Sequence, residues 1–452
     1  MEVYPYHVFV CEQRKPEGLP CCSARGSAAV IEALRREVAV RGLTEKVLVT
    51  ACGSIGLCER GPNMVVYPEG VWYSGVQPED VPEIVASHFE EGVPVRRLLN
   101  ADPSALQEEV RINRSRYLQS LRAKEAAGLL PDDLQQTIRA FQDSRVILTA
   151  VELDAFAAVG GGATAEDAAA RMHSDPRATE MLLNALVALG LLEKRNQQFR
   201  CLPVAERHFT AGPHDARGAV GHMVSLWRTW SNLTDAVRTG TAAGHQEMAE
   251  RGGDWTTTFI AAMHQNATER APHVVAAVGA AGVRRMLDVG GGSGAYSIAF
   301  AGAAPALAAD ILDLPTVLPI AQGHIDAAGL SSRIHLRSGD LRRDDLGSGY
   351  DLVFVSAICH MLAPDENRDL LRRCYAATAP GGRIVIQDFL LEPDRTAPKF
   401  AVLFALNMLV GTAAGNSYTE AEYASWLEET GYGEIKRVRL PGPSNLVVAR
   451  RA

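Results

Sequence analysis

The last part of the chain alternates short apolar runs with helical segments, and this alternation limits the possible folds more than any other feature. Five runs rich in β-forming residues follow Gly282: MLDVGG, LAADILD, RIHLRSGD, YDLVFVSA and GRIVIQDF. Helical segments separate these runs, and strands joined by helices form parallel sheets that the helices cover on both faces. The sequence therefore predicts a parallel α/β domain over residues 282–452.

The overall composition is that of a globular protein. The chain has 452 residues, enough for about three domains. With 47% hydrophobic and 22% charged residues, it is not collagen-like, coiled-coil or largely disordered. The net charge of −8 disfavours a nucleic-acid binder held by phosphate contacts. No secretory signal is visible, and the apolar part of residues 400–418 is shorter than the ~20 residues of a membrane span. We expect a soluble, cytoplasmic protein with no nucleic-acid or membrane partner.

Four further segments precede the α/β domain. They are a small α/β module with the order β-α-β-β-β-α, a charged helical linker, a helical module with a terminal β-wing, and a helical connection, over residues 1–100, 101–130, 131–210 and 211–281. A winged helix can bind DNA. However, Asp132 to His208 contains 11 acidic and 8 basic residues, so the module lacks the basic surface that this role requires.

The first predicted strand of the α/β domain runs into a glycine-rich loop, LDVGGGSGAYS, at residues 287–297. Glycines let the backbone approach a ligand closely, and the following helix offers free N–H groups. Asp313 lies 25 residues after Asp288, where its carboxylate can accept hydrogen bonds from both ribose hydroxyls. Asp340 ends a third strand, where it can flank an adenine. These acids predict a nucleoside pocket. A dinucleotide pocket is the alternative, and the missing Lys-Ser/Thr ending excludes a Walker loop.

His360 follows the run YDLVFVSA, at the edge of the sheet where open α/β domains bind their ligands. A neutral imidazole with a pKa of ~6.5 can accept the proton of a hydroxyl group in catalysis. From the residues alone, a structural or helix-capping histidine is the alternative.

Residues 131–452 resemble the SAM-dependent O-methyltransferase family of the plant caffeate and bacterial hydroxyindole type. The resemblance rests on LDVGGGSG, the acid in DLP, the GD pair and the segment SAICHMLAPDENRDLLRRC. It implies a winged-helix-like dimerisation domain, a Rossmann-like catalytic domain, a homodimer, and O-methylation of a small hydroxylated, aromatic acceptor. It also implies that six residues contact SAM: Gly290, Gly292, Asp313, Asp340, Leu341 and Ser356.

The same resemblance assigns the catalytic base to His360 and its supporting acid to Asp388 in VIQDF. The sequence departs from the family pattern at three places. Plant relatives usually carry lysine at Ser356, a second supporting acid falls at Ser417, and His360 is followed by Met-Leu where the family has Asp-Trp. These departures leave C- or N-methylation and a non-methylating relative open.

Five of the eight cysteines lie within the first 58 residues. In a cytosolic chain, such clustering indicates a metal or redox centre rather than structural disulfides. Four thiolates, at Cys11, Cys22, Cys52 and Cys58, could hold a 2Fe–2S cluster. Inert buried thiols are the alternative.

The N-terminal module also resembles the thioredoxin-like 2Fe–2S ferredoxins, through HVFVC, CSARGS and CERGPNMVVYPEGVWYSGV. This resemblance implies ligands at Cys11 and Cys22, followed by a pair spaced Cys-x3-Cys. The pair departs from the family pattern because Ser54 takes the third position and Cys52 lies two residues earlier. Thiolate is the softer match for iron, so Cys52 is the predicted ligand, with Ser54 and Cys21 as alternatives.

The sequence as a whole predicts a ferredoxin-like module joined to a homodimeric SAM-dependent O-methyltransferase. Because methyl transfer is redox-neutral, the role of the cluster stays open. It could sense oxidation, dock a redox partner protein or stabilise the module. The alternative is a redox-responsive or electron-carrier protein whose SAM-binding domain methylates carbon or nitrogen, or does not methylate.

Overall fold

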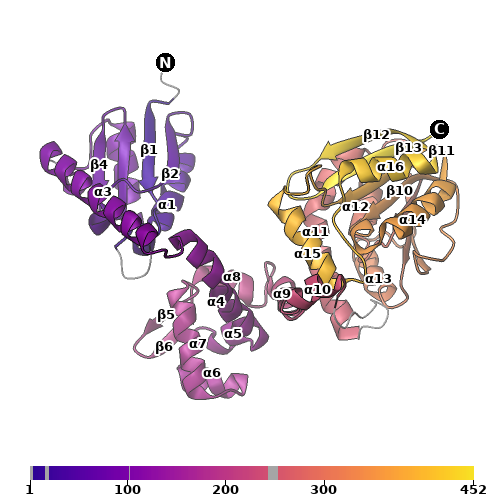
Figure 1. Cartoon of the computed structure of the whole chain (residues 1–452), viewed down its shortest axis with the longest axis horizontal. Helices are drawn as coiled ribbons and strands as arrows, with labels where there is room; N and C mark the ends of the chain where they lie inside the picture. Colours follow the sequence, from indigo (N-terminus) through magenta and orange to yellow (C-terminus); the bar gives the residue numbers. More distant parts are fainter. Residues whose placement is uncertain (1–3, 16–19, 101, 243–252) are drawn as a thin grey trace. The chain divides into compact units, whose positions relative to one another are not determined.

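The computed structural model describes residues 4–15, 20–100, 102–242 and 253–452 (Figure 1). The chain divides into two compact units, residues 1–142 and 143–452, and each is described by itself. The first unit is built on a small mixed sheet. The second contains a helical part and a large, mostly parallel sheet.

A four-stranded sheet with the order β2-β1-β3-β4 forms the first unit. Its elements are β1 (Tyr6–Cys11), α1 (Ser27–Val40), β2 (Val47–Cys52), β3 (Asn63–Tyr67), β4 (Val71–Ser74) and α2 (Val81–Ile84). The strands β1 and β2 are parallel because α1 crosses between them, whereas β3 and β4 form an antiparallel hairpin. The order β-α-β-β-β-α is the one that the sequence predicts.

The apolar core of this unit includes residues of β1 and of one face of α1. Val8 and Val10 alternate along β1, while Val30, Leu34 and Val38 recur at helical spacing along α1. All five are buried, and their two periods are those of a strand and an amphipathic helix.

Two long helices follow the sheet of the first unit, α3 (Pro103–Ala126) and α4 (Asp132–Glu152). The carboxylate of Asp102 caps α3 by accepting hydrogen bonds from the backbone N–H groups of Ser104 and Ala105. The predicted linker is therefore a regular helix over most of its length.

The second unit begins with a small helical group that carries a β-hairpin. Its elements are α5 (Ala155–Val159), α6 (Ala165–Met172), α7 (Pro176–Ala188), β5 (Leu192–Arg195), β6 (Gln198–Cys201) and α8 (Pro203–Phe209). Phe156, Leu183 and Phe199 are fully buried and join the helices to the hairpin. The hairpin occupies the position of the predicted wing.

A seven-stranded sheet with the order β12-β13-β11-β10-β7-β8-β9 forms the rest of the second unit. Its strands are β7 (Arg285–Val289), β8 (Ala308–Asp313), β9 (Ile334–Ser338), β10 (Tyr350–Ser356), β11 (Thr378–Asp388), β12 (Tyr432–Arg439) and β13 (Asn445–Arg451). The helices are α9 (Arg217–Trp230), α10 (Leu233–Thr239), α11 (Gly253–Val278), α12 (Ala295–Ala303), α13 (Leu318–Ala327), α14 (Pro364–Ala377), α15 (Lys399–Gly411) and α16 (Glu420–Thr430).

The strand order reverses between β7 and β10, and this reversal determines where a ligand can bind. The chain runs outward from β7 through β8 to β9, then returns to place β10 on the other side of β7. These strands are parallel, so their carboxyl ends lie at one edge. In open α/β sheets, ligands bind at that edge, at the point where the helices that follow two neighbouring strands lie on opposite faces of the sheet.

The apolar stretch considered in the sequence as a possible membrane span corresponds to α15, which has 13 residues. Within the described parts of the chain, no helix combines the length and the apolar character needed to cross a membrane.

Candidate functional site

The glycine-rich loop joins β7 to α12 at the carboxyl edge of the sheet. Gly290, Gly292 and Gly294 adopt positive φ angles of 67°, 57° and 78°, which side-chain-bearing residues rarely adopt. A Cβ at Gly290 would collide with Ile358 and approach Leu341 Cδ2 to 3.3 Å. The structure therefore brings the predicted residues Gly290 and Leu341 together, and the close packing leaves room only for glycine.

The carboxylate of Asp313 holds this loop against the end of β8. Its Oδ2 accepts a hydrogen bond of 2.7 Å from the backbone N–H of Gly292, and its Oδ1 accepts one of 2.7 Å from Leu314. Burial raises the pKa of Asp313. Each carboxylate oxygen has a second lone pair, so the group can still accept hydrogen bonds from a ligand.

Asp288 lies beneath the loop and is the most deeply buried acid of this edge. Its Oδ2 accepts a hydrogen bond of 2.7 Å from the hydroxyl of Ser297, while Oδ1 has no partner among the described residues. Burial raises the pKa of Asp288 to about 7. A buried acceptor without a donor costs free energy, so this oxygen suits a ligand that carries a hydrogen-bond donor.

The other two predicted cofactor residues lie at the carboxyl ends of two strands, Asp340 just after β9 and Ser356 at the end of β10. The carboxylate of Asp340 accepts a hydrogen bond from the backbone N–H of Arg342 and lies 3.3 Å from the Arg343 guanidinium. The Ser356 hydroxyl donates a hydrogen bond of 3.1 Å to Gln387 Oε1. Both residues are half-buried.

Helix α11 fixes the loop through a contact that the sequence did not reveal. His264 Nδ1 lies 2.8 Å from the Ser293 hydroxyl, and the His264 ring stacks on that of His324 with centroids 3.7 Å apart. Burial, with the neighbouring His324, lowers the pKa of His264. This contact could not be predicted from a local sequence motif, because the three residues come from α11, the loop and α13.

His360 lies on a short turn, Cys359–Met361, directly after β10, and its ring is held by Asp388 at the end of β11. The ring Nδ1 is 2.7 Å from Asp388 Oδ1, and the backbone N–H of His360 donates a hydrogen bond of 3.1 Å to Oδ2. A carboxylate only accepts, so Nδ1 carries the proton and Nε2 has a free lone pair. Nε2 has no hydrogen-bond partner within the described ranges.

Asp388 receives two further hydrogen bonds, from the Phe389 backbone at 2.8 Å and from the Tyr423 hydroxyl at 2.9 Å. Burial raises the pKa of Tyr423 well above its usual value, so the hydroxyl stays a donor. Ser417 stands where the family resemblance implies a second supporting acid, and its hydroxyl donates to the Ala401 carbonyl. Tyr423 contacts Asp388 from α16, 35 residues further along the chain.

Phenylalanine rings surround the His360 imidazole. Phe404 meets it edge-to-face with ring centroids 4.8 Å apart, and Phe389 lies nearly parallel to it at 6.1 Å. Phe400 extends this group, because its ring centroid lies 4.9 Å from that of Phe389 and its side chain is 47% exposed. These flat apolar surfaces suit an aromatic ligand.

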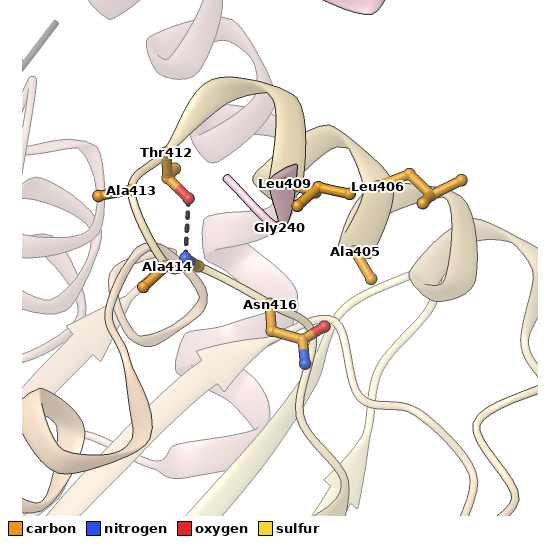
Figure 2. Close-up of a pocket in the computed structure, with 9 residues that line it drawn as sticks. Gly240, Ala405, Leu406, Leu409, Thr412, Ala413, Ala414 and Asn416 are labelled. Atoms are coloured by element: carbon orange, nitrogen blue, oxygen red, sulfur yellow. Dashed lines mark hydrogen bonds between the residues drawn. The ribbon is translucent and has the colours of Figure 1, made fainter. Parts of the chain in front are cut away.

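A cavity of about 300 Å³ lies on a different face of α15 (Figure 2). Ala405, Leu406 and Leu409 line it together with the loop from Thr412 to Asn416. These residues follow Phe404 by one, two and five positions, so the helix turns them away from the face that meets His360. The cavity nevertheless adjoins the base, because the Asn416 backbone N–H donates a hydrogen bond of 2.9 Å to the His360 carbonyl.

Two tryptophans near the end of α9 contact other elements of the second unit. Trp230 donates a hydrogen bond of 2.9 Å from Nε1 to Asn407 Oδ1, which ties α9 to α15. The Arg145 guanidinium on α4 lies 5.8 Å from the Trp227 ring centroid. Both contacts join neighbouring elements.

The structure describes all four predicted thiolates of the first unit. Among the described residues, no three Cys, His, Asp or Glu side chains are arranged to hold a metal ion. Cys11 and Cys22 pair by a hydrogen bond that lowers the pKa of Cys11. The strand register places Cys52 beside Cys11, whereas Cys58 Sγ lies 3.5 Å from the Ser54 hydroxyl. Cys52 and Ser54 line the same groove, together with aromatic neighbours.

Comparison with protein families identifies the domains that make up most of the second unit. Residues 230–433 match the O-methyltransferase domain, and residues 135–210 match the O-methyltransferase dimerisation domain. Both matches lie outside the four-stranded sheet of the first unit. They agree with the α/β class that the sheet and its glycine-rich loop define, and the dimerisation domain supports a homodimer.

Individual relatives give the same assignment. The chain is 36% identical over 314 residues to 3-hydroxy-5-methyl-1-naphthoate 3-O-methyltransferase of Streptomyces sahachiroi, covering 68% of this chain and 91% of that protein. Among solved structures, PigF with SAH has a TM-score of 0.67 at 26% identity and covers 72% of this chain and 100% of its own. Human N-acetylserotonin methyltransferase with SAM has a TM-score of 0.62 at 26% identity, with 71% and 96% covered. The chain belongs to the SAM-dependent O-methyltransferase family.

The residues at the sheet edge fit SAM. A Cβ at Gly292 would meet no atom closer than Ile260 at 4.0 Å, so the space beside the loop is open. The Asp313 carboxylate keeps lone pairs for the ribose hydroxyls, and the unpartnered oxygen of Asp288 suits the ammonium group of the methionine part.

The packing of the loop predicts a strong effect of Gly290→Ala. The added Cβ collides with Ile358 and requires a positive φ, which costs about 1–2 kcal/mol before any clash. We expect weaker SAM binding by calorimetry and a lower melting temperature. Gly302→Ala is the matched control, because Gly302 lies in α12 with open space around it. Equal SAM affinity in the two variants would contradict this account of the loop.

Proposed function

We propose that this enzyme transfers the methyl group of SAM to a hydroxyl oxygen of a small aromatic acceptor, with His360 as the general base. The observation that carries the proposal is the buried His360–Asp388 pair, which lies within a group of phenylalanine rings at the ligand-binding edge of the sheet. The name of the Streptomyces sahachiroi relative, which describes a hydroxynaphthoate O-methyltransferase, supports an aromatic acceptor.

Gly290, Gly292, Asp313, Leu341 and Ser356 would hold SAM at this edge. Asp340 joins them from the end of β9. When bound, SAM supplies an electrophilic methyl group, and the transfer needs the acceptor oxygen in line with the methyl carbon and the sulfur. The protein contributes this alignment and the removal of one proton.

The geometry of His360 allows it to remove that proton. Nε2 accepts the hydroxyl proton while the oxygen forms its new bond to carbon and the carbon–sulfur bond breaks. The imidazolium that results is stabilised by the hydrogen bond from Nδ1 to Asp388. Asp388 stays in position because its carboxylate also accepts hydrogen bonds from Phe389 and Tyr423.

Removing the base should lower turnover without affecting SAM. We expect His360→Ala to reduce the rate of methyl transfer roughly 100- to 10,000-fold, as for loss of a general base, while SAM affinity stays near that of the parent. His335→Ala, an exposed histidine on β9, is the control. The measurement is transfer of labelled methyl from SAM to a hydroxynaphthoate. Near-parental turnover in His360→Ala would show that another group takes the proton.

Tyr423 is proposed as a positioning residue. Tyr423→Phe removes one hydrogen-bond donor from Asp388, so the carboxylate and the His360 ring that it orients are held less firmly. We expect kcat to fall roughly tenfold while the KM for SAM stays near the parental value. Tyr432→Phe is the matched control, because its buried hydroxyl bonds to Thr378 instead. A parental kcat in Tyr423→Phe would refute the role.

We also propose that the first unit binds a 2Fe–2S cluster, with a redox partner or a structural role as its use. The support is the arrangement of two neighbouring pairs, Cys11 with Cys22 and Ser54 with Cys58, around one loop whose Ile55 backbone N–H reaches the Cys11 thiol. Cys52 is the proposed fourth ligand because the strand register places it beside Cys11, and Ser54 and Cys21 are the alternatives.

The ligand question has a direct test in iron content. Anaerobically purified protein should contain about two irons per chain and absorb visible light. We expect Cys52→Ala to lose most of the iron and Ser54→Ala to retain it, with Cys201→Ala in the second unit as the control. The reverse result would make Ser54 the ligand. Parent protein without iron under these conditions would end the proposal.

A further inference from the structure

Arg270 on α11 is a half-buried cation that has no anionic partner among the residues the structure describes. Its guanidinium carbon lies 5.9 Å from the centroid of the Phe389 ring. Other arginines that lie over rings also donate hydrogen bonds to oxygen: Arg145 to Glu152, Arg285 to Ser348, Arg368 to Asp365 and Arg451 to Tyr375. Arg270 has no such bond within the described ranges.

The position of Arg270 places this charge beside the reacting groups. Phe389 follows Asp388 directly, and its ring centroid lies 6.1 Å from that of His360. Arg270 and the base therefore lie within about 6 Å of one shared ring. Arg270 also acts on Tyr296, where its charge opposes the burial that raises the pKa of that phenol.

A guanidinium in this setting has unmet hydrogen-bonding capacity. It presents five N–H donors in a planar fork that matches a carboxylate, and its attraction to an aromatic face satisfies none of them. Partial burial makes those donors more costly to leave unpaired than on an open surface. The missing partner is therefore a planar anion that enters with a ligand.

We propose that Arg270 binds a carboxylate in the reaction site, and this rests on the proposed O-methylation. Two ligands carry that group: an aromatic acceptor acid and the methionine part of SAM. The shared ring with His360 favours the acceptor, and the hydroxynaphthoate in the name of the Streptomyces sahachiroi relative carries both a hydroxyl and a carboxylate. The enzyme would then select hydroxylated aromatic acids by charge as well as by shape.

The test compares an acid with its neutral analogue. The probes are 3-hydroxy-5-methyl-1-naphthoate and its methyl ester, which keeps the ring and hydroxyl but removes the charge. We expect Arg270→Gln to lower kcat/KM for the acid roughly 10- to 100-fold and to leave the ester almost unchanged. Arg270→Lys should keep part of the preference for the acid, because lysine retains the positive charge but lacks the planar set of N–H donors. Arg368→Gln, an arginine over Trp426, is the control.

Binding measurements separate the two sources of the carboxylate. If the partner is SAM, Arg270→Gln weakens SAM and SAH binding roughly tenfold or more and leaves the ratio of acid to ester unchanged. Dissociation constants of the acid and the ester, measured with SAH-saturated protein, test the role of Arg270 even if no methyl transfer occurs. Failure of the proposed O-methylation can therefore be distinguished from failure of the proposal for Arg270. Unchanged SAM affinity in Arg270→Gln, with no preference of the parent for acid over ester, would overturn the proposal.

Discussion

The carboxylate of Asp388 is the point on which the geometry of the candidate active site depends. Its two oxygens accept four hydrogen bonds, which come from the turn after β10, from its own strand and from α16. A buried carboxylate with this many donors cannot rotate freely. The imidazole of His360 therefore has one tautomer and one orientation, and its free nitrogen is available on the other side of the ring.

The parts of the site that the sequence indicates are those formed by residues close together in the chain or by the order of strands. The glycine-rich loop and Asp313 follow from the alternation of strand and helix, because parallel strands bring their carboxyl ends to one edge. Tyr423 could not be predicted in the same way. Its contact with Asp388 depends on how α16 packs against the sheet, and neither residue type nor spacing fixes that packing.

The first unit illustrates the same limit. The sequence indicated its strand and helix order and the clustering of its cysteines. The choice between Cys52 and Ser54 as a ligand could not be made from the sequence, because it depends on the path of a short loop after β2. Chemical softness favours cysteine as an iron ligand, whereas the loop places serine beside Cys58.

The position of β13 between β11 and β12 has a consequence for how the enzyme forms. β11, which carries Asp388, pairs on one side with β10 and on the other with a strand that the ribosome adds much later, since Gln387 bonds to Ser444 across 57 residues of chain. A nascent polypeptide that has completed the loop and Asp313 still lacks the strand and helix that enclose Asp388. The chain therefore carries the loop and Asp313 well before it carries the strand and helix that hold Asp388 in place, so the surroundings of the His360–Asp388 pair are the part of this edge that synthesis completes last.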